Sequence, residues 1–185
     1  MHPKDIIDYE CEDCDLHKLR TNVVWGNGNY LSKIAFIGES PGASEDEEGL
    51  AFVGDSGILL MKTFWALKRQ KKEFLYLNIL RCRPPKNRNP SKIEIRACDK
   101  YLRKQIQCCP NLKVLVALGR VSWTALTGSE LSVIANHGKV IKNGKFKILY
   151  TYHPSFLLRN RNIEIKKDFI RDIRKAINLS RGGRI

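Results

Sequence analysis

Four short apolar segments with a high β-propensity recur along the 185-residue chain. They are Ile34–Ile37, Phe74–Leu80, Val114–Leu118 and Ile148–Tyr152. Apolar runs of this length, rich in β-branched and aromatic residues, predict buried strands. In addition, the dipeptide Asn143-Gly144 lies between two β-prone runs and predicts a tight hairpin turn.

Helix-like segments lie between these strands. Ser91 and Glu94 have the spacing at which the two side chains cap each other's backbone amides, which predicts the start of a helix. Near the end of the chain apolar residues recur every four positions from Ile165 to Ile177, which predicts one face of an amphipathic helix. The predicted helices are Gly57–Lys68, Ser91–Gln107, Gly119–Leu126 and Ile163–Leu179.

The alternation of strands and helices predicts an α/β fold with a mostly parallel sheet covered on both faces. In such sheets ligands bind beyond the carboxyl ends of the strands. We therefore expect the segments that follow the strands to converge on one site. These segments are Gly38–Gly42, Asn78–Pro85, Gly119–Val121 and His153–Ser155.

The net charge of +14 is unevenly distributed along the chain. Residues 1–50 carry 4 basic and 11 acidic side chains, whereas residues 51–185 carry 29 basic and 8 acidic ones. This asymmetry favours a polyanionic partner for the later part of the chain, although a solvated lysine-rich surface is the alternative. Against the trend, 38–54 holds five carboxylates directly after a predicted strand.

The length predicts one domain, spanning 1–185, that is large enough to bury a core. Its apolar runs are too short to span a membrane, and the first residues contain no apolar signal core. We therefore expect an intracellular, cytoplasmic protein without a membrane partner.

Six cysteines are many for an intracellular domain. Cys11 and Cys14 have the spacing of a metal clip, while Cys82 ends a predicted strand and Cys98 lies on the capped helix. The chain can turn back between the last two and bring all four thiols together. Four thiolates suit either zinc or a [4Fe–4S] cluster, and their spacing leaves this choice open. Burial of Cys82 and Cys98 as apolar side chains is the alternative.

Four motifs together resemble the family 4 uracil-DNA glycosylases, in order and over most of the chain. They are Gly38-Glu39-Ser40-Pro41-Gly42 with Glu45-Asp46, Ala51-Phe52-Val53-Gly54, Asn78–Pro85 and His153-Pro154-Ser155. The resemblance implies a three-layer α/β/α sandwich around a mostly parallel four-stranded sheet. It also implies a [4Fe–4S] cluster, rather than zinc, on Cys11, Cys14, Cys82 and Cys98.

The activity that the resemblance implies is that of a monofunctional DNA glycosylase, a hydrolase. Such an enzyme flips uracil out of DNA and hydrolyses its N-glycosidic bond, and the abasic site that it leaves starts base excision repair. We expect the chain to act as a monomer on uracil-containing DNA, either single- or double-stranded.

Within this resemblance, five residues are expected to bind the flipped uracil. Phe52 stacks on the ring, Asn78 reads O4 and N3–H, and His153 donates a hydrogen bond to O2 as negative charge gathers there. Where Ser40 stands, the family usually has a small apolar residue or glycine, and the wider superfamily often has an aspartate that directs the attacking water. A serine is no carboxylate, so Glu39 is predicted to position the water and face the cationic sugar, while the Ser40 hydroxyl helps to hold that water.

The DNA contacts are expected around this pocket. An exposed leucine, Leu157 or Leu158, fits a wedge that fills the gap left by the flipped base, although packing onto the last helix is the alternative. Glu45–Glu48 are expected at the pocket wall and rim, where they exclude a C5 methyl group, unless they form a solvated loop. The predicted phosphate contacts are Ser155, Arg83, Lys86, Arg88, Arg159 and Arg161.

Two other interpretations stay open from the sequence. A metal-stapled nucleic-acid-binding module without catalysis explains the charge and the cysteines, but it does not explain Glu39, Asn78 and His153 at three strand ends. A covalent uracil-binding relative is the second, although the chain has no obvious basic insertion after its acidic stretch, which marks that group.

Overall fold

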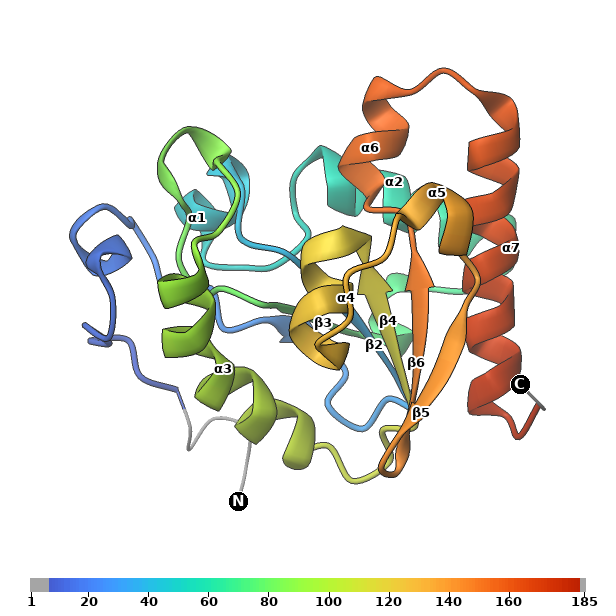
Figure 1. The fold of residues 1–185 in the computed structure, drawn as a ribbon, viewed down its shortest axis with the longest axis horizontal. Coiled ribbons are helices and arrows are strands. Elements are labelled where there is room, and N and C mark those ends of the chain that lie inside the picture. Colours follow the sequence, from blue (N-terminus) through green and yellow to red (C-terminus); the bar gives the residue numbers. More distant parts are fainter. Residues whose placement is uncertain (1–6, 184–185) are drawn as a thin grey trace.

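The computed structural model describes residues 7–183, which form a sheet between layers of helices (Figure 1). The sheet has six strands in the order β1-β3-β2-β4-β6-β5. The strands are β1 (Asn27–Gly28), β2 (Ile34–Gly38), β3 (Leu75–Asn78), β4 (Val114–Leu118), β5 (Val140–Asn143) and β6 (Phe146–Thr151).

The four central strands confirm the predicted parallel sheet, but the whole sheet is larger than expected. β3, β2, β4 and β6 pair in parallel, whereas β1 and β5 add one antiparallel strand at each edge. β1 spans only two residues, too few to show a period in the sequence. β5 and β6 form the hairpin that Asn143-Gly144 predicted, with Asn143 paired to Phe146.

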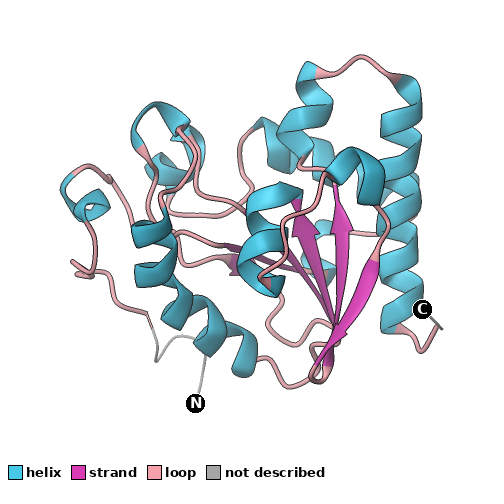
Figure 2. Ribbon diagram, viewed as in Figure 1, coloured by secondary structure: helices cyan, strands magenta, loops and turns pink. Residues whose placement is uncertain are grey.

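Seven α-helices and three short 3-10 helices surround the sheet within residues 7–183 (Figure 2). The α-helices are α1 (Ala43–Glu48), α2 (Asp55–Ala66), α3 (Lys92–Gln107), α4 (Gly119–Thr127), α5 (Val133–Asn136), α6 (Pro154–Arg159) and α7 (Ile163–Ser180). The 3-10 helices are η2 (Asp15–Lys18), η3 (Lys71–Glu73) and η4 (Pro85–Asn87). No helix in the described part of the chain is both long enough and apolar enough to cross a membrane.

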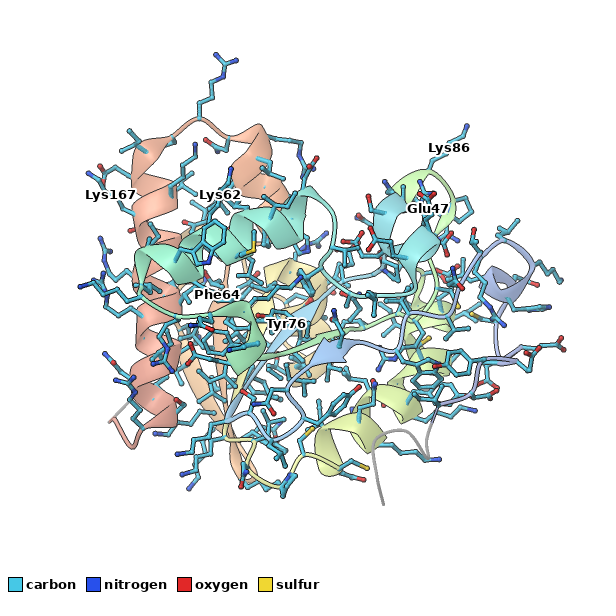
Figure 3. All side chains as sticks on the ribbon, turned by 180° about the vertical axis from the view of Figure 1, so that it is seen from behind. Glu47, Lys62, Phe64, Tyr76, Lys86 and Lys167 are labelled. Carbon is cyan, nitrogen blue, oxygen red and sulfur yellow. The ribbon has the colours of Figure 1, made fainter. Side chains whose placement is uncertain are left out.

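The two faces of the sheet have separate cores, because alternate residues of a strand point to opposite faces. On one face Phe36 of β2 packs with side chains of α2 and α7, and on the other Ile37 packs with α3 and α4. Figure 3 shows Phe64 of α2 and Tyr76 of β3 inside the first of these cores, with ring centroids 6.4 Å apart. The chain therefore has the three-layer α/β/α architecture.

The predicted helix start at Ser91 is confirmed. Ser91 Oγ accepts a hydrogen bond from Glu94 N at 3.2 Å, and Glu94 Oε2 accepts one from Ser91 N at 2.7 Å. This capping box orients α3, which begins beside the loop that follows β3. The carboxyl ends of the parallel strands all point toward the side of the molecule where α1, this loop and α6 lie (Figure 1).

Candidate active site

A cavity of about 370 Å³ opens at the carboxyl ends of β2, β3 and β6. It brings together residues from all four glycosylase-like motifs and from three of the four segments that were expected to converge. The fourth segment, Gly119–Val121, does not line the cavity, although Gly119 lies next to His153. Ser56, Asn87, Asn89 and Phe156 also line it, although the sequence did not single them out. The predicted site residues that line the cavity are Glu39, Ser40, Glu45, Phe52, Asn78, His153, Ser155 and Arg159.

Gly38 at the end of β2 lets two of these side chains lie side by side. A Cβ atom at this position would lie 2.4 Å from Asn78 Oδ1 and 2.7 Å from Phe52 Cζ, so a larger residue displaces both. Asn78 is buried at the end of β3, and its side-chain amide makes no hydrogen bond within residues 7–183. The amide is therefore available to a ligand.

Phe52 belongs both to the core and to the cavity wall. Its side chain is buried, and its ring lies 5.8 Å from that of Tyr76. Its backbone has φ +57°, an uncommon conformation for a residue with a side chain, which surrounding contacts must hold. One such contact is a hydrogen bond of 2.8 Å from Lys71 Nζ to the Phe52 carbonyl.

His153 is held in one orientation at the start of α6. Its Nδ1 accepts a hydrogen bond from Ser155 N at 3.2 Å and lies 2.8 Å from Ser155 Oγ. A backbone N–H always donates, so Nδ1 carries no proton and the neutral ring carries its proton on Nε2. Burial, aided by the charge of Arg159, lowers the pKa of His153 to about 4. At neutral pH the imidazole is therefore an uncharged hydrogen-bond donor.

Glu39 lies in the same cavity, directly after Gly38. Burial raises the pKa of its carboxyl group, and the nearby charge of Arg120 opposes this rise. Arg120 is exposed in the first turn of α4, within one of the four segments expected to converge. We did not predict it as a site residue, although its place after a strand end was a usable signal.

Two other carboxylates of the acidic stretch bind backbone rather than solvent. Glu45 accepts hydrogen bonds from the amides of Gly42, Val53 and Gly54 at 2.9 to 3.1 Å. Asp46 accepts from the amides of 21–22 at 3.1 to 3.3 Å and so points away from the cavity. The acidic stretch is therefore a helix with structural carboxylates, not a solvated loop throughout.

The structure separates the two candidate wedge leucines. Leu157 is 2% exposed and packs in the core with α7, so the prediction that it is an exposed wedge is wrong. Leu158 is 50% exposed, because successive residues of a short helix point in different directions. Of this pair, Leu158 alone has the exposure that a wedge requires.

The predicted phosphate contacts of the 83–90 loop differ in whether their side chains already bind other residues of the protein. Arg88 makes two hydrogen bonds to Glu94, at 2.5 and 2.9 Å, and thereby fastens the loop to α3. Arg83 Nε donates to Asn87 Oδ1 at 2.7 Å. Lys86 projects from the tip of the loop (Figure 3). Beyond this loop, Arg159 and Arg161 are exposed next to the cavity and after α6, respectively.

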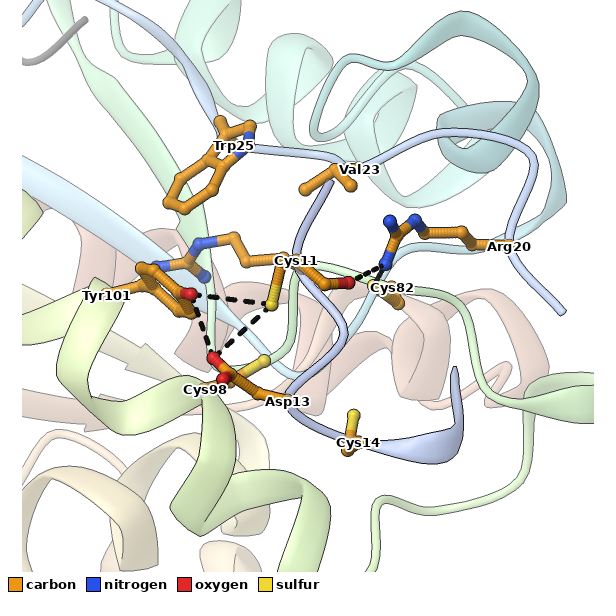
Figure 4. Close-up of a pocket in the computed structure, with 10 residues that line it drawn as sticks. Cys11, Asp13, Cys14, Arg20, Val23, Trp25, Cys82, Cys98 and Tyr101 are labelled. Carbon is orange, nitrogen blue, oxygen red and sulfur yellow. Dashed lines mark hydrogen bonds between the residues drawn. The ribbon is translucent and has the colours of Figure 1, made fainter. Parts of the chain in front are cut away.

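The four cysteines predicted to bind metal line a second, much smaller cavity of about 10 Å³ (Figure 4). Cys11 and Cys14 come from the N-terminal segment, Cys82 from the loop after β3 and Cys98 from α3. Asp13 fastens the N-terminal segment to α3 by accepting a hydrogen bond of 2.8 Å from the Tyr101 hydroxyl. The other two cysteines do not line this cavity.

The chemistry of this cavity fits an anionic metal–sulfur group. Two arginines, Arg20 and Arg81, line it together with the four thiols. The buried Nε of Arg81 has no hydrogen-bond partner within residues 7–183. In that part of the chain no three His, Cys, Asp or Glu side chains are close enough to hold one metal ion. The four thiols are therefore candidate ligands for a metal–sulfur group, and their arrangement does not by itself form a single-ion site within the described residues.

Comparison with known proteins agrees with this geometry. The model of the uracil DNA glycosylase superfamily matches residues 25–176. The chain therefore belongs to the uracil DNA glycosylase superfamily.

Three relatives place the similarity more narrowly, since each is a type-4 uracil-DNA glycosylase. The protein of Thermotoga maritima is 40% identical over 90% of this chain and 88% of its own length. That of Archaeoglobus fulgidus is 37% identical, over 86% of this chain and 84% of its own. That of Saccharolobus solfataricus is 38% identical, over 91% and 82%.

Gly38→Ala tests the geometry of the cavity. The new methyl group should displace the Asn78 amide and the Phe52 ring together, because both lie within 3 Å of its position. We expect ligand binding in the cavity to weaken by at least about tenfold, with a loss of stability in the range of about 1–3 kcal/mol typical of overpacking. Binding of free uracil, measured by calorimetry, and urea unfolding would check this. Unchanged uracil binding would contradict it.

Proposed function

We propose that this chain is a uracil-DNA glycosylase that acts as a single domain and as a monomer, hydrolysing the N-glycosidic bond of uracil in single- or double-stranded DNA. The observation that carries the proposal is the convergence of Asn78, His153 and Glu39 on one cavity beside the Phe52 ring. A nucleic-acid-binding module without catalysis does not need these side chains at three strand ends.

Recognition begins when uracil leaves the base stack and enters the cavity. Phe52 stacks on the ring, and the unpaired Asn78 amide donates to O4 while its oxygen accepts from N3–H. Cytosine has an amino group where uracil has O4 and no proton on N3, so it cannot satisfy the same amide. The Glu45 side chain lines the cavity, but its oxygens are occupied by backbone amides, which supports a role in holding the wall.

Bond cleavage is assigned to His153 and Glu39. As the bond between C1′ and N1 breaks, its electron pair goes to uracil, which leaves as an anion with charge on O2. The neutral His153 ring donates from Nε2 to that oxygen without giving up its proton. Glu39 faces the cationic sugar and orients a water whose oxygen bonds to C1′, and Ser40 helps to hold this water. The proton that this water releases when it bonds to C1′ finally neutralises the uracil anion.

DNA binding is assigned to the exposed groups around the cavity. Leu158 fills the gap in the stack, while Arg159, Arg161 and Lys86 contact phosphates. Arg83, Arg88 and Ser155 keep their predicted phosphate roles, although each also has an internal partner. The balance of 29 basic to 8 acidic side chains after residue 50 supports a polyanionic ligand.

The cofactor that we propose is a [4Fe–4S] cluster on Cys11, Cys14, Cys82 and Cys98. When bound, it supplies a rigid link and negative charge rather than electrons, since the hydrolysis transfers none. The four cysteines come from three separate segments, so a group bound to all of them joins the N-terminus, the loop after β3 and α3.

The proposed activity is tested with a uracil-containing oligonucleotide, followed by alkaline cleavage of abasic sites. The wild-type protein should produce strand breaks at uracil. His153→Ala should lower the single-turnover rate by about 10²–10³-fold, because it removes a donor that strengthens as the anion forms. DNA binding and thermal unfolding serve as controls. No cleavage by the wild-type protein would refute the function, and a fully active His153→Ala would refute the assigned role.

The pH dependence of the rate distinguishes the two catalytic groups. Glu39 must be ionised and its pKa is raised, so the rate should fall as the pH drops through a value above its usual one. His153, with a pKa of about 4, stays neutral across this range and adds no second limb. In Glu39→Gln the remaining rate should be slower and independent of pH. If the rate of Glu39→Gln still falls over the same pH range, Glu39 is not the group whose titration causes that fall.

The cluster is tested by its colour and metal content. Protein purified without oxygen should be brown, absorb at about 400 nm and contain about four irons, as such clusters do. Cys98→Ala should lose most of this iron, whereas Cys108→Ala, on the same stretch of chain but outside the cavity, should keep it. A colourless protein with one zinc would refute the assignment.

The phosphate contact of Arg159 is tested by the salt dependence of duplex binding. Each lost contact reduces the slope of log K against log salt by about 0.9. Arg159→Ala should therefore lower the slope by about one unit. Lys104→Ala is the matched control, because Lys104 is an exposed cation near the end of α3 and does not line the cavity. An equal change in both variants would remove Arg159 from the interface.

A further inference from the structure

One side chain, Arg81, contacts both the uracil cavity's framework and the cysteine cavity. Its Nη1 donates a hydrogen bond to the main-chain carbonyl of Asn78. The same side chain lines the cysteine cavity beside Cys82 and Cys98. It is 2% exposed, so neither contact is a transient surface contact.

The partners of this buried cation are all neutral. Besides Asn78, Nη2 donates to Gln105 Oε1, and the guanidinium lies 5.7 Å from the ring of Trp25. None of the ion pairs formed within residues 7–183 includes Arg81. A buried charge without a counter-charge is strongly unfavourable. The arginine therefore needs negative charge from the cavity that it lines.

The backbone around Arg81 is continuous with the uracil site. The two amides before it, of 79–80, donate to the carbonyls of Gly38 and Glu39 at 2.9 and 3.0 Å. Val24 N donates to the Arg81 carbonyl at 2.8 Å, which joins this turn to the N-terminal segment. Any shift of the Arg81 side chain is thus transmitted to the turn that orients the Asn78 amide.

We propose that Arg81 is a positioning residue that couples the metal–thiolate site to uracil recognition. The negative metal–thiolate group neutralises the guanidinium and holds it in place, and the guanidinium in turn holds the Asn78 carbonyl and so aims its amide at the base. This inference rests on the proposed function and adds to it a route by which a non-redox cluster supports base reading.

A double-mutant cycle with Asn78 tests the coupling. Arg81→Gln should lower the single-turnover rate of uracil excision by about tenfold to a hundredfold in the wild-type background, with little change in the protein concentration that half-saturates the DNA. In the Asn78→Ala background the same change should cost less than about threefold, because the amide that Arg81 positions is already gone. A merely structural role predicts equal losses in both backgrounds.

The cluster provides a readout that is independent of activity. With a chelator present, the absorbance at about 400 nm should decay at least about tenfold faster in Arg81→Gln, because one of the two cations beside the cluster is lost. Arg20→Gln is the matched control. Arg20 lines the same cavity and donates to Cys82 Sγ at 3.7 Å and to the carbonyls of Cys11 and Tyr9, but it donates no hydrogen bond to a residue of the uracil cavity. It should speed the decay without lowering excision per intact cluster.

Arg81→Lys separates charge from geometry. A lysine keeps the cation but donates from a single point, so it cannot hold Asn78 and Gln105 together. Cluster decay should stay near the wild-type rate, while excision falls by roughly three- to tenfold and again depends on Asn78. If Arg81→Gln does not fold, the excision rate and cluster decay of Arg81→Lys test the coupling without it.

Additive losses in the cycle, or wild-type excision per intact cluster in both Arg81 variants, would overturn the inference while leaving the glycosylase intact. Absence of excision by the wild-type protein would instead overturn the proposed function.

Discussion

The site depends on one buried carboxylate that holds two turns together. Glu45 accepts hydrogen bonds from Gly42 in the turn after β2 and from Val53 and Gly54 in the turn before α2. The first turn carries Glu39 and the second carries Phe52, so this one side chain sets the distance between the proposed catalytic carboxylate and the proposed stacking ring. Charge-assisted hydrogen bonds of this kind are about twice as strong as neutral ones.

This arrangement explains why a basic protein concentrates acid at a strand end. The carboxylates of Glu45 and Asp46 accept hydrogen bonds from backbone amides of the neighbouring turns and so offset the partial positive charge of these amides. Asp46 does so for 21–22, which links α1 to the segment that carries the first two cysteines. Glu45 and Asp46 of the acidic stretch thus join turns within the protein. The basic side chains that bind a polyanion in the proposed function come from residues 51–185.

Burial also controls the protonation of two titratable groups in the cavity, His153 and Glu39. Burial keeps the His153 ring neutral, and the Ser155 amide selects the tautomer with its proton on Nε2. In the proposed mechanism, such a neutral donor favours an anionic leaving group without binding it as an ion pair, so it would support departure of the base rather than only its binding. Burial also favours the neutral form of Glu39, because it raises the pKa of that carboxyl group. The nearby charge of Arg120 opposes this effect and favours the ionised carboxylate.

The sequence by itself determined the parallel centre of the sheet, the capped start of α3 and the hairpin at Asn143-Gly144, because these follow from local periodicity and turn chemistry. It also indicated which segments meet at the carboxyl edge of the sheet, since parallel topology brings strand ends together. The edge strand β1, with two residues, had no period to detect. Tertiary packing alone decided which leucine of 157–158 is buried, how Glu45 is used and where Arg81 lies. Each depends on partners distant in sequence, and no local pattern records such contacts.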